Sequence, residues 1–351
     1  MYSDTFIILG KVLKAAADGS FNGCDGFEQQ AEALAQCIDV ARNHNGWFTP
    51  EFVKMQFRSL AEMLSEGSVR QFSVKYQLND IGKCDKKVKV IAAGNIPLVC
   101  FHDILCVLMA GCRLVVKPSS KDRLLTHSVL EIIKIITPEL GDRIEEEEGE
   151  RIPFDAIIAT GSNNSARYFD YYFAKYPNII RSNRSSVAVL SGKECEDDYR
   201  LLADDIFAYY GLGCRSVSKI YVPKGYNYDL FFKGIYHKSD VMSNAKYSDN
   251  YTYNKAVYLM SGADILDNGF LLLKKDTGLS SPVGVVFCEE YNDFNTLAQT
   301  LLQDIDKLQC VVSKDVVAGL RTVLPGQSQH PSINDFADGI DTVEFLKSLN
   351  H

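Results

Sequence analysis

Two kinds of hydrophobic pattern divide the chain near residue 85. Before that point apolar residues recur at helical spacing, as between Glu28 and Asn43, and Thr49-Pro50-Glu51 is typical of a capped helix start. After it, short apolar runs of strand length alternate with segments of helical periodicity. The alternation predicts an α/β fold with a doubly wound, mainly parallel sheet, preceded by a helical N-terminal segment.

The expected elements can be placed by residue number. In the first half after residue 85 we expect strands at 88–93, 112–117 and 154–159, and helices at 98–110, 123–136 and 164–175. In the second half we expect strands at 186–190, 218–222, 270–274, 283–287 and 310–312, and helices at 195–210, 227–238 and 250–260. The acidic run at 145–148 is expected to be a solvated loop.

Length and charge narrow the class of protein. A chain of 351 residues is at the upper limit of one domain, so we expect two lobes. The net charge of −8 argues against a nucleic-acid partner, which normally meets a basic face. The sequence contains no run of 18 apolar residues, so no membrane span is expected. The first residues lack the pattern of a secretion signal, and we expect a cytoplasmic protein.

The cysteines and histidines give no sign of a metal. None of the ten cysteines forms a CxxC pair, and the six histidines show no HxxH or HExxH spacing. We therefore predict that no metal is bound. A GxSxG motif, the mark of many serine hydrolases, is also missing. His102-Asp103 at a helix start has two readings, an acid/base pair or a histidine satisfied by local hydrogen bonds.

One cysteine stands apart from the others by its surroundings. Cys214 lies in Gly211-Leu212-Gly213-Cys214-Arg215-Ser216, between an expected helix and an expected strand. A thiol on a glycine-rich turn can take up an acyl group, and the backbone N–H groups around it can bind the oxyanion that forms. Together with Gly94-Asn95-Ile96-Pro97 upstream, this turn favours acyl transfer followed by hydride transfer.

Small polar residues follow three successive expected strands. These are Gly94-Asn95-Ile96-Pro97, Val116-Lys117-Pro118-Ser119-Ser120-Lys121 and Thr160-Gly161-Ser162-Asn163-Asn164. The carboxyl ends of parallel strands are the usual ligand site of an open α/β sheet, and a helix start there binds phosphate. Each motif alone can also be a turn chosen for its shape. No GxGxxG is present, so a dinucleotide would be held in another way.

The ordered set of motifs resembles the aldehyde dehydrogenase superfamily. The set comprises Ala93–Pro97, Ala110–Ser119, Thr160–Ser162, Cys214 and Ser281-Pro282-Val283-Gly284. Within that superfamily the chain is most similar to the long-chain acyl-CoA reductases, the fatty-acid reductases of the bacterial luciferase system, through Gly211–Arg215 and Asp335–Thr342. The similarity covers about residues 85–345.

The resemblance implies a role for each matching position. Cys214 would be the nucleophile, and Asn95 with the Cys214 backbone N–H would form the oxyanion hole. The cofactor would be held by Lys117, Ser119, Ser120, Lys121, Gly161 and Ser162. The implied cofactor is NADPH, with NADH as the alternative, because Ser120 stands where NAD-preferring relatives often carry a glutamate.

The resemblance, together with the hydrophobic pattern, also predicts how the chain is divided into segments. We expect a helical N-terminal segment at 1–85 that packs on the cofactor lobe, a cofactor-binding lobe at 86–185, a catalytic thiol lobe at 186–320 and a C-terminal closing segment at 321–351. Two positions depart from the hydrolytic members of the superfamily. The stretch Arg181–Arg184 lacks their water-activating glutamate, and Gly278 replaces a glutamate that grips the nicotinamide ribose.

These residues predict an NAD(P)H-dependent reductase that converts an acyl-CoA to an aldehyde through an acyl-cysteine. Two alternatives remain at this point. The same thiol could serve an acyl phosphate or an acyl-carrier protein, or the chain could be a degenerate member that binds a nucleotide or a partner without turnover. Homo-oligomerisation is left open.

Overall fold

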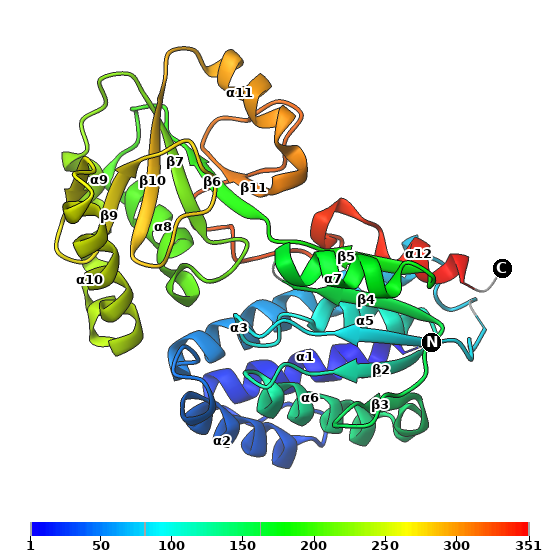
Figure 1. The fold of residues 1–351 in the computed structure, drawn as a ribbon. Helices are drawn as coiled ribbons and strands as arrows, with labels where there is room; N and C mark the ends of the chain where they lie inside the picture. Colours follow the sequence, from blue (N-terminus) through cyan, green and yellow to red (C-terminus); the bar gives the residue numbers. More distant parts are fainter. Residues whose placement is uncertain (1, 81, 162, 350–351) are drawn as a thin grey trace. The chain divides into compact units, whose positions relative to one another are not determined.

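The computed structural model describes residues 2–80, 82–161 and 163–349, and these form two compact units (Figure 1). The first unit contains Met1–Asn183 and Pro331–His351, and the second contains Arg184–His330. The helical N-terminal segment therefore shares a unit with the strands that follow it and with the C-terminal residues.

Helices α1–α4 open the first unit and strands β1–β5 follow. The helices are α1 (Ser3–Asp18), α2 (Glu28–His44), α3 (Pro50–Met63), α4 (Glu66–Lys75), α5 (Phe101–Met109), α6 (Arg123–Ile136), α7 (Asn163–Phe173) and α12 (Thr342–Ser348), with short 3-10 turns η1 (Pro138–Arg143) and η5 (Ala337–Gly339). The strands are β1 (Lys87–Ile91), β2 (Arg113–Lys117), β3 (Ile144–Glu146), β4 (Ala156–Thr160) and β5 (Asn178–Arg181).

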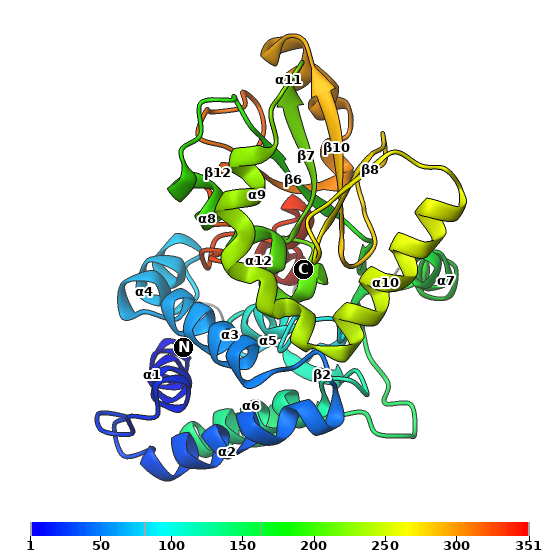
Figure 2. The ribbon, with the colours of Figure 1, turned by 90° about the vertical axis from the view of Figure 1, so that its left-hand side faces the viewer.

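The five strands form one parallel sheet in the order β3-β2-β1-β4-β5. Alternate residues such as Val88 and Val90 point to one face, where they join a large core that includes residues of α1–α6. In that core α1 packs on α2, α3 and α6, as Figure 2 shows. Burial of these apolar faces is the main stabilisation of the unit.

The second unit is built on a wider sheet. Its strands are β6 (Ser185–Val189), β7 (Val217–Pro223), β8 (Ile265–Asp267), β9 (Leu272–Lys275), β10 (Val285–Tyr291), β11 (Leu308–Val312) and β12 (Thr322–Val323). Its helical segments are α8 (Glu196–Phe207), η2 (Ala208–Gly211), α9 (Asp229–Ile235), η3 (Tyr236–Ser243), α10 (Ala245–Met260), α11 (Phe294–Gln303) and η4 (Ile305–Lys307). The strand order is β12-β11-β6-β7-β10-β9-β8, parallel except for the β8–β9 pair.

The predicted fold class, α/β with mainly parallel sheets, is confirmed. Among single elements, the helix at 123–136 is confirmed to the residue, and the capped start at Thr49 is confirmed by a hydrogen bond from the Phe52 N–H. The prediction of a solvated loop at 145–148 is wrong for its first three residues, because Ile144–Glu146 is strand β3 and the Glu147 side chain is buried. It is confirmed only at Glu148, which is an exposed bend. Within the described ranges, no helix has the length and apolar character that a bilayer crossing requires.

Candidate functional site

In the first unit three turns lie together at the carboxyl edge of the sheet. They follow β1, β2 and β4, which are hydrogen-bonded neighbours with β1 in the middle. The side chains of Asn95, Lys117, Ser120 and Lys121 are exposed there. The sheet thus gathers most of the predicted cofactor residues at one edge, where open α/β sheets bind ligands.

Gly94 and Ser119 bring two of these turns into contact. A Cβ atom on Gly94 would lie 2.2 Å from the Ser119 Oγ, a distance that no side chain can occupy. The Ser119 Oγ in turn accepts a hydrogen bond from the Lys121 N–H at 3.3 Å. Glycine is therefore required at position 94 by the packing of the two turns.

Lys117 is paired with a buried carboxylate that the sequence interpretation missed. Its Nζ lies 3.5 Å from the Glu147 Oε1, and the other oxygen of Glu147 is paired with the buried ammonium of Lys89. Lys89 lies in the middle of β1, on the face opposite the large core, under the ring of Phe154. A buried ammonium needs a counter-charge, which explains why Glu147 is buried and not in a solvated loop. A lysine within an otherwise apolar strand was the available signal.

The third turn is described only in part. Gly161 packs closely on α7, since a Cβ there would lie 2.7 Å from the Ser165 Cβ. The Gly161 N–H donates to the Arg181 carbonyl at 3.3 Å. Ser162, the last predicted cofactor residue, lies outside the described residues.

In the second unit Cys214 lies on a turn of unusual backbone conformation. Tyr209, Tyr210 and Gly211 all have positive φ, at 52°, 56° and 77°, and they lie in η2, directly after α8. Left-handed tyrosines are strained and persist only where the surroundings hold them. Both side chains are buried, and the Tyr210 ring packs on Tyr247 with centroids 5.8 Å apart.

The backbone of the thiol turn is fixed while the residue itself stays accessible. The Ser186 hydroxyl on β6 donates to the Cys214 carbonyl at 2.9 Å, and the Ser216 N–H donates to the Gly213 carbonyl at 3.0 Å. Cys214 and Cys195 are exposed, whereas Cys37 is half-buried and the other seven cysteines are buried. An exposed thiol on a rigid turn suits nucleophilic attack on a substrate.

A buried carboxylate supports a neighbouring loop. Asp205 on α8 accepts the Gly326 N–H at 2.6 Å and the Ser328 N–H at 2.9 Å. The Ser328 carbonyl accepts a hydrogen bond from the Arg215 guanidinium at 3.4 Å. Burial raises the pKa of Asp205 to about 6, although the Ser328 hydroxyl and the two N–H donors oppose that rise. Arg215, which follows the thiol, is thereby anchored.

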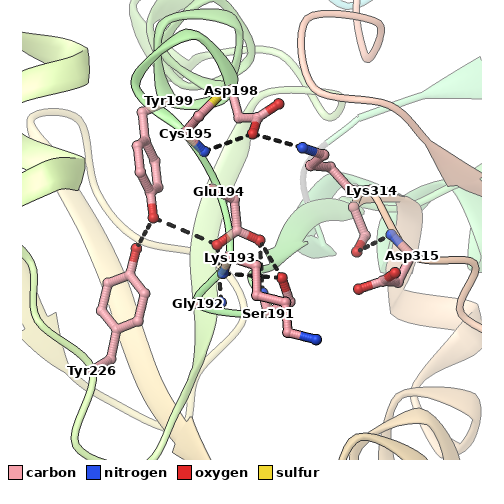
Figure 3. Close-up of polar contacts among 11 residues, drawn as sticks. Ser191, Gly192, Lys193, Glu194, Cys195, Asp198, Tyr199, Tyr226, Lys314 and Asp315 are labelled. Atoms are coloured by element: carbon pink, nitrogen blue, oxygen red, sulfur yellow. Dashed lines mark hydrogen bonds and ion pairs between the residues drawn. The ribbon is translucent and has the colours of Figure 1, made fainter.

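At the carboxyl edge of the second sheet several polar side chains are bonded to one another (Figure 3). There, where the strand order reverses between β11 and β6, Glu194 accepts hydrogen bonds from the Ser191 N–H, the Ser191 hydroxyl and the Gly192 N–H at 2.7–2.9 Å. Lys314 and Asp198 form an ion pair of 2.8 Å beside Cys195. These side chains use one another as hydrogen-bond and ion-pair partners. Cys214 does not lie at this edge, because it precedes β7 and so lies at the amino-terminal edge of the sheet.

The remaining sequence predictions concern metals and acids. His127, Glu131 and Glu146 bring their ligand atoms within 4.8 Å of one another, but the Lys134 ammonium lies 2.7 Å from Glu131 and supplies a positive charge there.

In the stretch Arg181–Arg184, which lacks a glutamate, Arg181 is buried in an ion pair with Asp103. The His102 ring nitrogen bonds to the Ile333 carbonyl at 2.8 Å, which supports the structural reading of that histidine.

The fold is that of the aldehyde dehydrogenases. Aldehyde dehydrogenase 21 from Physcomitrella patens, solved with the reaction product succinate, matches with a TM-score of 0.68 and 14% identity, over 99% of this chain and 84% of that one. An indole-3-acetaldehyde dehydrogenase solved with NAD+ matches with a TM-score of 0.64 and 12% identity, over 96% and 80%. No protein-family model and no curated protein sequence matches the chain.

Proposed function

We propose that this chain is an NAD(P)H-dependent acyl-CoA reductase that releases an aldehyde. The observation that supports the proposal most directly is the Cys214 turn, which combines an accessible cysteine with a backbone fixed by Ser186. The aldehyde dehydrogenase fold is consistent with it, because solved proteins that share the fold are named aldehyde dehydrogenases and one of them is in complex with NAD+.

In the proposed first step the Cys214 sulfur attacks the thioester carbonyl carbon. A bond forms between this sulfur and the acyl carbon, the bond to the CoA sulfur breaks, and CoA leaves with the proton of the Cys214 thiol. Backbone N–H groups of the turn and the Asn95 amide would stabilise the oxyanion, an effect worth about 10²–10³ in rate for each donor.

We propose that the residues at the first unit's edge bind a nicotinamide dinucleotide. Lys117, Ser120 and Lys121 present exposed groups at the end of β2 and in the turn that follows it, Gly161 lies in the turn after β4, and α7 starts directly after that turn. We propose that these residues hold the ribose and phosphate groups, together with Ser162. When bound, the reduced cofactor supplies the hydride that converts the acyl group on Cys214 to the aldehyde, and the thiolate is released. NADPH is the proposed donor and NADH the alternative.

The decisive test is to trap the acyl group. The protein is incubated with an acyl-CoA and no reduced cofactor, and peptide mass spectrometry locates the adduct. We expect it on Cys214 and expect none in Cys214→Ala. Cys195→Ser, which removes the other exposed thiol, should behave as wild type. An adduct on Cys195 alone would contradict the proposal, because Cys195 and not Cys214 would then be the nucleophile.

A panel of donors then separates the alternatives. Cofactor oxidation is measured with acyl-CoA thioesters of several chain lengths, an acyl phosphate and an acyl-carrier protein. Turnover with an acyl phosphate alone would replace the proposed carrier but keep the thiol mechanism. An unreactive Cys214 with measurable nucleotide binding would instead identify a non-catalytic member.

A further inference from the structure

Leu98 has a backbone conformation that needs support. It directly follows the Gly94–Pro97 turn, it is 2% exposed, and its φ is +51°. The left-handed region is disfavoured for a residue with a bulky side chain, so the surrounding structure must hold it there. The support is a hydrogen bond of 2.7 Å from the Leu98 N–H to the Asp122 Oδ2.

Asp122 occupies a helix N-cap position, where the carboxyl group ordinarily accepts a hydrogen bond from the helix's own backbone. It is the N-cap residue of α6, but its side chain accepts no hydrogen bond from a backbone N–H of that helix's first turn. A capping aspartate normally accepts from its own helix, and that contribution to stability is given up here. The side chain is buried, and its Oδ1 has no hydrogen-bond partner among the described residues. Its recorded bonds are to the Leu98 N–H and, at 3.4 Å, the Thr126 hydroxyl.

Asp122 also belongs to the second strand-end turn. It directly follows Lys121, and its own N–H donates to the Ser119 carbonyl at 3.0 Å. Ser119 in turn is the residue that packs against Gly94. Asp122 therefore links the turn after β1 to the turn after β2 by a contact at each end, one through its side chain and one through its backbone.

We propose that Asp122 is a positioning residue, which holds Leu98 in its left-handed conformation and thereby sets the direction in which the Gly94–Pro97 turn presents Asn95. This inference rests on the proposed function, because the role of Asn95 as an oxyanion donor does. It adds a residue that no motif indicated, since an aspartate before a helix reads in the sequence as an ordinary cap.

The chemical state of this carboxyl group determines which substitution is conservative. Burial raises the pKa of Asp122 to about 8, although its bonds to Leu98 and Thr126 oppose that rise. Cys100 is the titratable neighbour recorded beside it, and burial together with Asp122 raises the pKa of that thiol. A carboxyl group that is mostly protonated at neutral pH is mimicked by an amide of the same shape, so Asp122→Asn should keep the acceptor for Leu98.

The experiment is a double-mutant cycle between Asp122 and Asn95. Turnover is measured for Asp122→Ala, Asn95→Ala and the double variant, with Asp122→Asn as the conservative change. Thr126→Val is the matched control, because it removes the weaker contact to the same carboxyl group. We expect Asp122→Ala to lower kcat roughly 10- to 100-fold, which is at most the effect of removing one oxyanion-hole donor. If Asp122 acts through Asn95, the same change should cost less than about threefold in the Asn95→Ala background.

A second arm does not need turnover. Amide hydrogen exchange is followed in the peptide that covers residues 93–101. Asp122→Ala should accelerate exchange there by about tenfold or more, whereas Asp122→Asn and Thr126→Val should leave it near wild type. This arm still reports on the Leu98 contact if the acyl-CoA proposal fails.

Three outcomes would overturn the inference. They are unchanged exchange in Asp122→Ala, additive effects of the two alanine substitutions on kcat, and a loss of activity in Asp122→Asn as large as in Asp122→Ala. If Asp122→Ala does not fold, Asp122→Ser takes its place in both arms, with the same expectations.

Discussion

The Glu147 carboxylate lies 3.5 Å from the ammonium of Lys117, the lysine that the resemblance assigns to the cofactor ribose. The same carboxylate is paired with Lys89, so one buried acid serves two lysines. Its neighbours in the acidic run are paired as well, Glu146 with His127 and Glu148 with Arg123. The edge at which the cofactor residues lie therefore carries carboxylates beside its cations.

This pairing bears on the choice between NADPH and NADH. A carboxylate near Lys117 opposes a 2′-phosphate, so we expect the NADPH preference in kcat/KM to be tenfold or less, as for about 1 kcal/mol of screened electrostatic interaction. Ser120→Glu should shift the ratio toward NADH. Removing the buried pair with Lys89→Met and Glu147→Gln together should shift it toward NADPH.

The double change is needed because Glu147→Gln alone would leave the Lys89 ammonium buried and unpaired, at a cost of about 3–5 kcal/mol in the free energy of unfolding. The measurement is kcat/KM for both cofactors in wild type and in each variant. If neither variant changes the ratio, this edge does not read the 2′ position.

Hydrophobic periodicity predicted helices and strands well where the apolar pattern of a segment is clear. The helix at 123–136 carries a clear apolar period, and the strands at 88–93 and 112–117 are short apolar runs; each was placed to within about three residues. The prediction of a solvated loop for the acidic run was wrong at Glu147 because a single residue, Lys89, needs a counter-charge on the far face of the sheet. That need depends on tertiary contacts and does not appear in a local charge pattern.

In the candidate site, too, local motifs could be found in the sequence, whereas residues that act through tertiary contacts could not. Motif order was enough to single out Cys214 and the three strand-end turns as candidates, because each motif is continuous in sequence. The residues that hold them were missed, since Ser186 lies 28 positions from Cys214 and Asp122 lies 24 from Leu98. The left-handed tyrosines before Gly211 were also missed, because backbone strain imposed by tertiary packing has no signature of its own in the sequence.

The contact between Gly94 and Ser119 makes a second prediction. Gly94→Ala places a Cβ 2.2 Å from the Ser119 Oγ and should displace one turn, at a cost of about 1–3 kcal/mol in the free energy of unfolding. Both kcat and cofactor affinity should fall. Ser119→Gly removes the clashing atoms, so the double variant should regain most of the stability lost in Gly94→Ala. Urea unfolding and cofactor titration of the four proteins test this; no rescue would mean that the clash is not the cause.

A third prediction concerns water. No carboxylate stands in the stretch Arg181–Arg184, and Arg181 itself is buried against Asp103. The acyl-cysteine should therefore persist without a hydride donor, because no base in that stretch activates water. The adduct on Cys214 is followed over time by intact-mass spectrometry. Release of free acid at a rate near that of reductive turnover would contradict the proposal, and would point to a base elsewhere.

The last prediction is a pH dependence of stability that arises at Asp205. Burial raises the pKa of this carboxyl group from 3.8 to about 6 in the folded protein. Between these values the folded state holds a proton that the unfolded state has lost, so the free energy of unfolding falls as the pH rises. The contribution is complete below about pH 4 and is lost as the pH passes 6, with a slope of at most about 1.4 kcal/mol per pH unit.

Asp205→Asn removes this titration and keeps one acceptor for the Gly326–Ser328 loop. Urea unfolding of both proteins at pH 4.5 and pH 7 should show a stability advantage of wild type that is larger at pH 4.5. A constant or growing advantage toward pH 7 would show that the two N–H donors of the loop outweigh burial, and that Asp205 is ionised in the folded protein. In that case Asp205→Asn should also loosen Arg215, and a fall in turnover at pH 7 without a change in cofactor affinity would reveal it.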